Sequence, residues 1–563
     1  MNNQYQMDST LRLKYPETIS EDNTNSGVSD RVRLGIIAGL VVLSLALRLF
    51  DLGTGSLWFD TAHSVALADS KNIAEVFSGA AKDFQAPFYF ILLHFWIKLG
   101  YSDLWVKLFS VLLGTAVVVM TFITAESMFS RRTAILGALL TSLSSYQVFY
   151  SRYPRAYMLM ALLALISIWA LYTAIREGRV RSWVIYTIVT VLGLYTHAYY
   201  IFVAIAEIVF FLTLVSVRRG EDLKLLRPWE VSQAIVLLTF IPWISVTWSQ
   251  WTGIQEGADS WIAPVGLESL QQLYFWLWHR TKEDYPYLAS IPLWLGIYLM
   301  TTLLLFSLFS RPVLRRIEGN GWWEKWMLWC VTVCPVFLAF SISLLSSTIW
   351  HPRYLVYISA PFYILVAQAI INLKDRIPAL GRPARLRRAF NIAALGMILA
   401  VSLPPLDTLY SNPSYRTPEL KESFTWIQSQ YRQGDMVMHI HYQSYLPYLW
   451  YAQSLGPKEQ VATHTIPCVW ESLPQHWCTK ATYRQSLLSQ ETGGISHAQL
   501  GADRVWLVGL YEHRQDGAEG QAEEAVDGLI RDLYQKCSTS QILDLSVHKF
   551  LGVNIYELKQ ACG

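Results

Sequence analysis

The sequence predicts a polytopic α-helical membrane protein with a hydrophilic α/β domain after its last span. Of the 563 residues, 53% are hydrophobic and only 15% are charged, whereas soluble domains carry about 25% charged residues. Apolar runs close to the ~20-residue length that crosses a bilayer also recur along the chain. The net charge of +3 is small and no basic stripe alternates with aromatic residues, so we expect no nucleic-acid partner.

The apolar runs predict eleven spans, and the arginines beside them predict the topology. Residues 1–32 are polar, and we expect them to be disordered and cytoplasmic because Arg31 and Arg33 flank the start of the first span. Alternate loops are then basic, as at Arg131 and Arg132, and the chain after residue 404 is outside. The expected spans of this transmembrane domain, 33–404, are 33–50, 105–128, 133–149, 156–175, 183–197, 198–217, 230–248, 288–310, 326–347, 354–373 and 389–404.

Two of the outside loops, 51–104 and 249–287, are long. The first contains APFYFILLHFWIKL (86–99), which is apolar but too short to span comfortably. Counting it as a span would invert every later loop, so we predict an interfacial or re-entrant helix. The aromatic end of loop 249–287 predicts a second interfacial helix.

Residues 405–563 predict a separate extracytoplasmic α/β domain. Helices are expected at 419–431 and 523–535, and strands at 434–441, at 503–510 and in the segments QILDLSV and GVNIYEL. Its four cysteines would suit disulfides outside the cytoplasm, but their spacing leaves the pairing open and four free thiols remain the alternative. These are Cys468, Cys478, Cys537 and Cys562, whereas Cys330 and Cys334 lie in a span and are expected to be packing residues.

Three arginines oppose the topological bias. Arg152 and Arg155 lie in the short outside loop FYSRYPRAY, and Arg353 lies in HPRY at the outer end of a span. One explanation is an ion pair or a snorkelling side chain. The other is a phosphate site at the outer surface, since the planar guanidinium donates two hydrogen bonds to a phosphate.

Several groups that can do acid–base chemistry share this side. Asp60 lies in SLWFDTAHSV, Asp83 precedes the interfacial helix, and His197 lies in LYTHAYY. A carboxylate can act as general base for a hydroxyl nucleophile, while arginines neutralise a phosphate leaving group. The alternatives are an N-cap of a helix 61–70 for Asp60 and a structural interface residue for His197. Glu207, within a span, is expected to hydrogen-bond inside the bundle.

These motifs together resemble those of the GT-C glycosyltransferases, in particular the protein O-mannosyltransferase and aminoarabinose transferase group. SLWFDTAHSV resembles their first-loop W-x-D-E signature, and DFQAPFYF resembles their D-x-H-P-P-L-Y-Y segment. VFYSRYPRAYMLM resembles the outer-loop S-x-x-x-R-x-Y pattern, and YTHAYY and PRYLVYISAP complete the series. The resemblance covers roughly residues 33–375, in order.

The resemblance implies transfer of a sugar from a polyprenyl-phosphate donor to an acceptor outside the cytoplasm, with inversion. The family's catalytic aspartate falls on Asp60, which would be the general base. Its donor-phosphate arginines fall on Arg353 and Arg155. The resemblance gives six further expected contacts: Tyr354 and Tyr157 for the donor phosphate or lipid, and Tyr195, His197, Asp83 and Gln85 for other parts of the substrates.

The sequence departs from the family pattern at two places. Thr61 replaces the second carboxylate of the D-E pair, and Gln85-Ala86 replaces the histidine and one proline of H-P-P. Hard cations favour several oxygen ligands, so a bound divalent metal is not indicated and we expect no cofactor.

The function predicted from the sequence is therefore a GT-C-type glycosyltransferase of a bacterial inner membrane, with its N-terminus in the cytoplasm. The acceptor would be a glycan, a lipid or a protein. Two alternatives are open: a transporter or flippase of lipid-linked glycans, and a diverged relative without activity. Transporter sites usually lie near the bilayer midplane in repeated folds, and no internal repeat is visible here.

Overall fold

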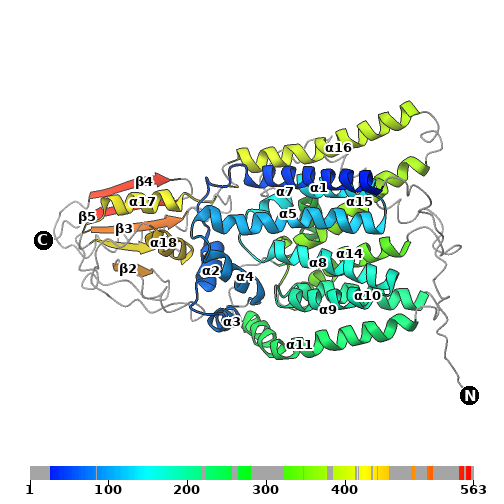
Figure 1. The fold of residues 1–563 in the computed structure, drawn as a ribbon. Coiled ribbons are helices and arrows are strands. Elements are labelled where there is room, and N and C mark those ends of the chain that lie inside the picture. The colour runs from blue at the N-terminus through cyan, green and yellow to red at the C-terminus, as the bar shows by residue number, and fades with distance from the viewer. Residues whose placement is uncertain are drawn as a thin grey trace, which may run out of the picture.

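A computed structural model shows a bundle of long helices joined at one end to a small sheet (Figure 1). The structure describes residues 26–83, 85–217, 223–256, 264–279, 322–346, 348–376, 384–412, 415, 417–432, 435–439, 442–454, 484–487, 504–510, 544–550 and 553–559. We call the end of the bundle that faces the sheet the sheet end. The short helices of the first long loop lie there, between the bundle and the sheet.

Ten of the eleven expected spans fall on helices, and the span 288–310 lies outside the described residues. The bundle helices are α1 (Ser26–Leu49), α5 (Asp103–Met128), α6 (Arg131–Leu143), α7 (Ser145–Ser151), α8 (Tyr157–Glu177), α9 (Val180–Leu194), α10 (Tyr200–Val217), α11 (Leu223–Glu256), α14 (Trp322–Leu345), η2 (Pro352–Ile358), α15 (Ser359–Arg376) and α16 (Ala384–Ser411). Within the described ranges, seven helices are long and apolar enough to cross a membrane. The polytopic helical fold is thus confirmed.

The first loop forms three short helices that close the sheet end of the bundle. They are α2 (Phe59–Ala68), α3 (Ile73–Lys82) and α4 (Phe88–Ile97). Helix α4 is the expected apolar segment, and its ten residues are too few to cross a bilayer. Its Trp96 ring stacks on Trp105 of α5 with centroids 4.6 Å apart, and each indole donates to the other's backbone carbonyl oxygen, at 2.8 and 3.0 Å. This pair fixes α4 against the bundle.

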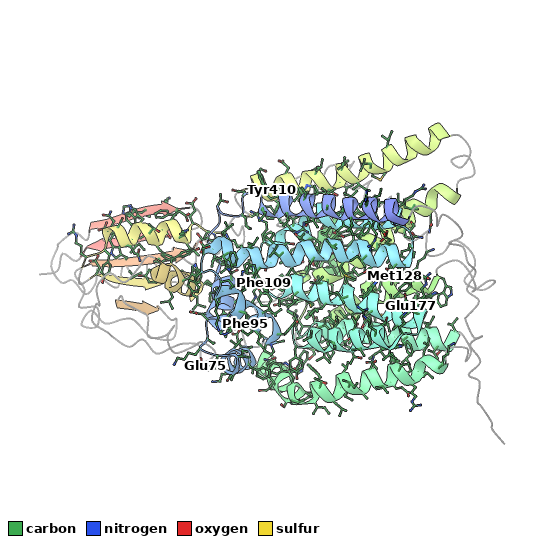
Figure 2. All side chains as sticks on the ribbon, viewed as in Figure 1. Glu75, Phe95, Phe109, Met128, Glu177 and Tyr410 are labelled. Carbon is green, nitrogen blue, oxygen red and sulfur yellow. The ribbon has the colours of Figure 1, made fainter. Side chains whose placement is uncertain are left out.

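The second long loop differs from the prediction at its start. Helix α11 continues to Glu256, so the chain leaves the helix later than residue 248, although Pro228 and Pro242 lie inside it. The expected aromatic helix is α12 (Leu267–Trp278), of which Leu273 and the last four residues are buried. Side chains fill the space between the helices along the whole bundle (Figure 2).

The C-terminal part contains α17 (Leu420–Gln430), α18 (Tyr442–Ser454) and a five-stranded sheet. The strands are β1 (Met436–His439), β2 (Arg484–Leu487), β3 (Arg504–Leu510), β4 (Asp544–Phe550) and β5 (Val553–Lys559). Their order is β2-β1-β3-β5-β4. β1 is parallel to β2 and β3, whereas β5 is antiparallel to β3 and β4. The α/β class of this part is confirmed. The helix expected at 523–535 and the four cysteines of the C-terminal part lie outside the described residues.

Two predictions about buried groups in the bundle are confirmed. Cys330 of α14 is buried in the core, Cys334 is partly buried against that core, and both are free thiols. Glu207 of α10 is completely buried, and the Ser167 hydroxyl of α8 lies 2.7 and 3.0 Å from its two carboxyl oxygens.

Candidate active site

Asp60 lies in the first turn of α2 and does not cap it. The helix begins at Phe59, and the residue at the cap position is Trp58, whose side chain makes no capping bond. The alternative interpretation of Asp60 as an N-cap is therefore wrong. The positive end of the helix dipole still favours a carboxylate in the first turn.

The two oxygens of the Asp60 carboxylate have different surroundings. Oδ2 lies 3.3 Å from Nη1 of Arg353 and accepts a hydrogen bond from the Tyr153 hydroxyl at 3.1 Å. Among the described residues, no group donates to Oδ1. The side chain keeps 22% of its surface exposed. One oxygen is therefore held in place while the other remains open to a substrate.

Arg155 holds the helix turn that carries Asp60. Its Nη1 donates to the backbone carbonyl oxygen of Asp60 at 3.2 Å and to the Ser64 hydroxyl at 3.1 Å. Ser64 in turn donates to the same carbonyl oxygen at 2.8 Å. Arg155 therefore reaches the backbone of Asp60, while Arg353 reaches its carboxylate.

The charges around Asp60 keep it ionised. Burial alone would raise the pKa of the carboxyl group, but the guanidinium groups of Arg155 and Arg353, the Tyr153 hydroxyl and His63 together lower it below the ordinary value. The same burial and the nearby Asp60 charge hold the pKa of Tyr153 well above its usual value. Asp60 is therefore a carboxylate at neutral pH and Tyr153 remains a protonated donor.

Arg353 is placed by the short helix η2. His351 caps this helix by accepting from the Arg353 backbone N–H through Nδ1 at 3.1 Å, and Pro352 occupies the first turn. The Tyr146 hydroxyl donates to the Pro352 carbonyl oxygen. The guanidinium lies 5.1 Å from the centroid of the Tyr354 ring and donates to its hydroxyl at 3.1 Å. The bundle thus fixes the direction of the arginine.

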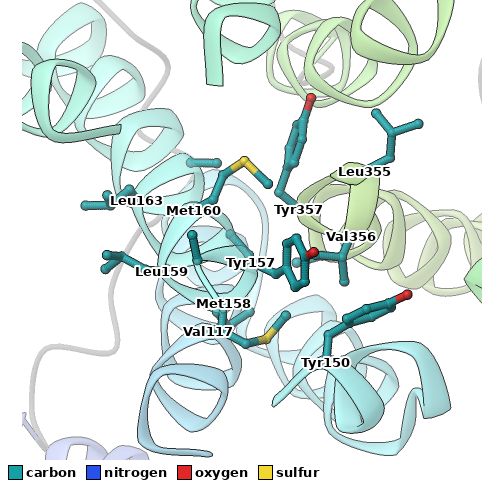
Figure 3. Packing of buried hydrophobic residues seen from close by; sticks show 14 of the residues in the cluster. Val117, Tyr150, Tyr157, Met158, Leu159, Met160, Leu163, Leu355, Val356 and Tyr357 are labelled. Carbon is teal, nitrogen blue, oxygen red and sulfur yellow. The ribbon is translucent and has the colours of Figure 1, made fainter. Parts of the chain in front are cut away.

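Three aromatic rings stand beside Arg353. The His197 ring lies 5.3 Å from Tyr354 and 6.1 Å from Tyr157, measured between centroids. Tyr157 projects from α8 toward Val356 of η2 (Figure 3). Burial lowers the pKa of His197 to about 3, with a further contribution from the positive charges of Arg155 and Arg353. His197 is therefore a neutral imidazole that extends the aromatic wall.

The remaining expected contacts are less central. Asp83 caps the end of α3, and its carboxylate lies 3.2 Å from Nε2 of His63, one helical turn after Asp60. The Tyr195 hydroxyl donates to the Thr239 carbonyl oxygen of α11 at 2.9 Å, so it is not directed to the Asp60 carboxylate. Gln85 donates its backbone N–H to the Ala80 carbonyl oxygen at 3.1 Å.

Comparisons with known proteins agree with this architecture. Residues 85–246 match the family model for dolichyl-phosphate-mannose-protein mannosyltransferase. Apo ArnT from Cupriavidus metallidurans aligns over 93% of this chain and 98% of its own, with a TM-score of 0.54 and 12% identity. The ArnT structure with undecaprenyl phosphate aligns over 94% and 98%, with a TM-score of 0.50 and 12% identity.

A third solved structure aligns over less of its own length. The archaeal oligosaccharyltransferase AglB from Archaeoglobus fulgidus, in complex with an inhibitory peptide and a dolichol-phosphate, aligns over 86% of this chain and 70% of its own. Its TM-score is 0.51 and its identity is 12%. The chain has the GT-C fold. No curated protein sequence matches this chain at a significant level.

The family model covers only part of the candidate site. It includes the loop with Arg155 and the turn with His197, but it begins after Asp60 and ends before Arg353. The fold joins these parts, since Asp60 and Arg353 are 293 positions apart and in contact.

Three residues that contact Asp60 or its helix turn, Tyr153, Ser64 and His63, were not predicted from the sequence. Tyr153 lies between the two arginines of FYSRYPRAY, and its contact with Asp60 depends on how α7 ends. His63 and Ser64 follow Asp60 by three and four residues, the spacing that places side chains on one helix face. That spacing was the signal that could have found them.

A clamp from the C-terminal part holds the segment just before Asp60. Tyr451 of α18 accepts from the Leu57 backbone N–H at 2.7 Å and donates to the Asp103 carboxylate at 3.0 Å. The Trp450 indole donates to the same carboxylate at 2.7 Å. Thr417 donates to the Ser56 carbonyl oxygen at 2.6 Å. We call these contacts the Tyr451 clamp; they connect α18 to the start of α2.

Proposed function

We propose that this protein transfers a sugar from a polyprenyl-phosphate donor to an acceptor hydroxyl at the sheet end of the bundle. The observation that supports this most is the Asp60 carboxylate, with one oxygen held by Arg353 and Tyr153 and the other open. A base and a phosphate-binding cation thus lie side by side at one end of a membrane bundle. ArnT with undecaprenyl phosphate and AglB with dolichol-phosphate support a lipid phosphate as the leaving group.

In the proposed step, Oδ1 of Asp60 takes the proton of the acceptor hydroxyl. The acceptor oxygen attacks the anomeric carbon of the sugar as the bond from that carbon to the phosphate oxygen breaks. The electron pair leaves with the phosphate, which departs as polyprenyl phosphate. A single displacement of this kind inverts the anomeric configuration.

The cations have separate tasks in this proposal. Arg353 contacts the Asp60 carboxylate oxygen that also accepts from Tyr153. A phosphate bound to the Arg353 guanidinium would therefore lie next to Asp60, the proposed base. Arg155 fixes the α2 turn through the Asp60 backbone and adds positive charge. Tyr157, Tyr354 and neutral His197 offer ring faces for the sugar or the first prenyl units, and Asp83 supports α2 through His63.

The location and the acceptor extend the same proposal. Met128 and Glu177, which precede the basic turns at Arg131 and Arg179, lie at the end far from the sheet (Figure 2). The positive-inside rule then supports a cytoplasmic far end and an external sheet end. We propose a bacterial inner membrane, no bound metal, and a glycan, lipid or protein acceptor.

The test is transfer by purified protein in liposomes that contain the polyprenyl-phosphate sugars extracted from its host. Free polyprenyl phosphate is measured by mass spectrometry for wild type, Arg353→Gln and the exposed control Arg179→Gln. We expect release by wild type and the control, and a loss of about 10²–10³-fold for Arg353→Gln, as for removal of one group that stabilises a developing anion. Donor binding without any release by wild type would contradict the proposal.

A further inference from the structure

A second pair of arginines lies at the sheet end of the bundle, beyond the groups that surround Asp60. Arg48 belongs to the last turn of α1, and Arg152 follows the end of α7. Both lie beside Tyr410 of α16, which Figure 2 labels at the sheet end. The Arg152 guanidinium is 5.4 Å from the Tyr410 ring centroid. The Tyr410 hydroxyl donates to the carbonyl oxygen of Leu47, next to Arg48.

Arg48 is a buried charge with neutral partners. Its side chain is 0% exposed. Nε donates to the Ser151 hydroxyl at 3.0 Å and Nη1 to the Ser44 carbonyl oxygen at 3.4 Å. Nη2 has no hydrogen-bond partner in the part of the chain that the structure describes. Because a charge in an apolar interior requires compensation, a fork that ends in an unpaired N–H group points to a missing anion.

The bundle is built to admit this side chain. At Gly114 of α5, an added Cβ would lie 2.1 Å from the Ser151 hydroxyl oxygen and 3.1 Å from Nε of Arg48. Any larger residue at that position would displace the arginine or its serine partner. The position of the cation is therefore fixed by its neighbours.

Arg152 adds a second guanidinium with little compensation. Nη2 donates to the Asp51 carbonyl oxygen at 2.7 Å, and the Asp51 charge acts on the guanidinium. Arg152 has no carboxylate within ion-pair distance among the described residues. Among the described residues, Asp51 is the acidic side chain whose charge acts on Arg152, and no carboxylate pairs with Arg48. The proposed transfer reaction uses neither arginine.

We propose that Arg48 and Arg152 form a second anion site, which takes the phosphate headgroup of a membrane lipid once the Tyr410 ring moves aside. Phosphate fits because Nη2 of Arg48 and the N–H groups of Arg152 that do not bond Asp51 can donate to its oxygens. A lipid fits because Leu49 and Phe50, next to Arg48, are 41% and 62% exposed and give an acyl or prenyl chain an apolar surface. This inference does not depend on the transfer reaction.

The test is native mass spectrometry of the detergent-purified protein with added phosphatidic acid, a lipid with a phosphate monoester. Arg353→Gln serves as the background, so that lipid bound near Asp60 does not contribute. In that background we expect Arg152→Gln to weaken phosphatidic acid binding roughly tenfold, the loss expected for one charge-assisted contact. Tyr410→Ala should strengthen it by removing the cover. Arg179→Gln, at the far end, should leave it unchanged.

The outcomes distinguish a lipid phosphate from free inorganic phosphate, and both from a purely structural role of the two arginines. Equal binding by Arg152→Gln and the background protein would overturn the site. Inorganic phosphate that displaces phosphatidic acid at equal concentration would overturn its assignment to a lipid. Because Arg48→Gln could fail to fold, the test uses variants of Arg152 and Tyr410, which are both partly exposed. Transfer activity is measured in parallel with wild type, so failure of the proposed reaction would be seen independently.

Discussion

Removal of one hydroxyl from the Tyr451 clamp should slow catalysis without preventing folding. Tyr451→Phe keeps the ring of a side chain that is only 1% exposed, but it removes the acceptor of the Leu57 N–H and the donor to Asp103. Leu57 is itself 1% exposed, so its N–H would be left unpaired. An unpaired buried donor costs about 1–3 kcal/mol.

The expected magnitude follows from this cost. If about 2 kcal/mol appears as lost positioning of α2, kcat falls by up to about 30-fold. The contacts of Thr417 and Trp450 remain, so the domain should stay attached and the loss should not exceed this value. The donor KM should change little, because Arg353 belongs to a different element.

The assay is release of polyprenyl phosphate at saturating donor, compared with the matched variant Tyr431→Phe. Tyr431 donates its hydroxyl to the Asp435 carbonyl oxygen at 3.2 Å within the C-terminal part, so the control removes a similar group without touching the clamp. A kcat for Tyr451→Phe within twofold of the control would refute the idea that the clamp positions Asp60. An increase confined to KM would refute it equally.

Three further predictions concern charge. The pKa of Asp60 is lowered in the folded protein, so its ion pair stabilises the fold above the ordinary aspartate pKa of about 3.9, and this stabilisation is lost as pH falls through the lower folded-state pKa. The pH profile of kcat should therefore show no acidic limb from Asp60 between about pH 5 and 8. An acidic limb above about pH 5 in wild type would contradict this prediction. Any residual activity of Arg353→Gln should show that limb at higher pH, measured from the same profiles. Glu207→Gln should keep the transfer rate within about twofold of wild type, because the amide can still bond Ser167. If this variant keeps transfer but no longer moves the lipid-linked glycan between the two leaflets of a liposome, the result would favour the flippase alternative. Treatment with EDTA should leave transfer unchanged, as the threonine at position 61 suggests, and restoration of lost activity by added Mg²⁺ or Mn²⁺ would show that a metal is needed.

The helices of the bundle were predictable because each span needs its own apolar run. The runs at α1, α5, α8 and α10 are long and bounded by arginines or turns, so their positions followed from composition. Helix α11 exceeded its predicted length because its polar ends continue the helix past the apolar run. Helix α3 and strand β2 were not predicted because they are short: α3 is amphipathic but has only ten residues, and β2 has only four.

The site was predictable in its residue types and less so in its contacts. Asp60, Arg155 and Arg353 were singled out by their side of the membrane and by the family motifs, and the fold brings them together. Which arginine reaches the carboxylate depends on η2 and on the loop after α7, which local sequence does not determine. The Tyr451 clamp was invisible in the sequence because its partners are 348 and 394 residues apart.

The most direct test of the central claim is donor turnover by Asp60→Asn, with Asp83→Asn as the matched carboxylate control. Purified variants are given the polyprenyl-phosphate sugar and an acceptor-containing membrane extract, and release of polyprenyl phosphate is followed together with donor binding. We predict that Asp60→Asn binds donor but loses release by at least about 10²-fold, while Asp83→Asn keeps most of it. Equal release by wild type and Asp60→Asn would show that the Asp60 carboxylate is not the base.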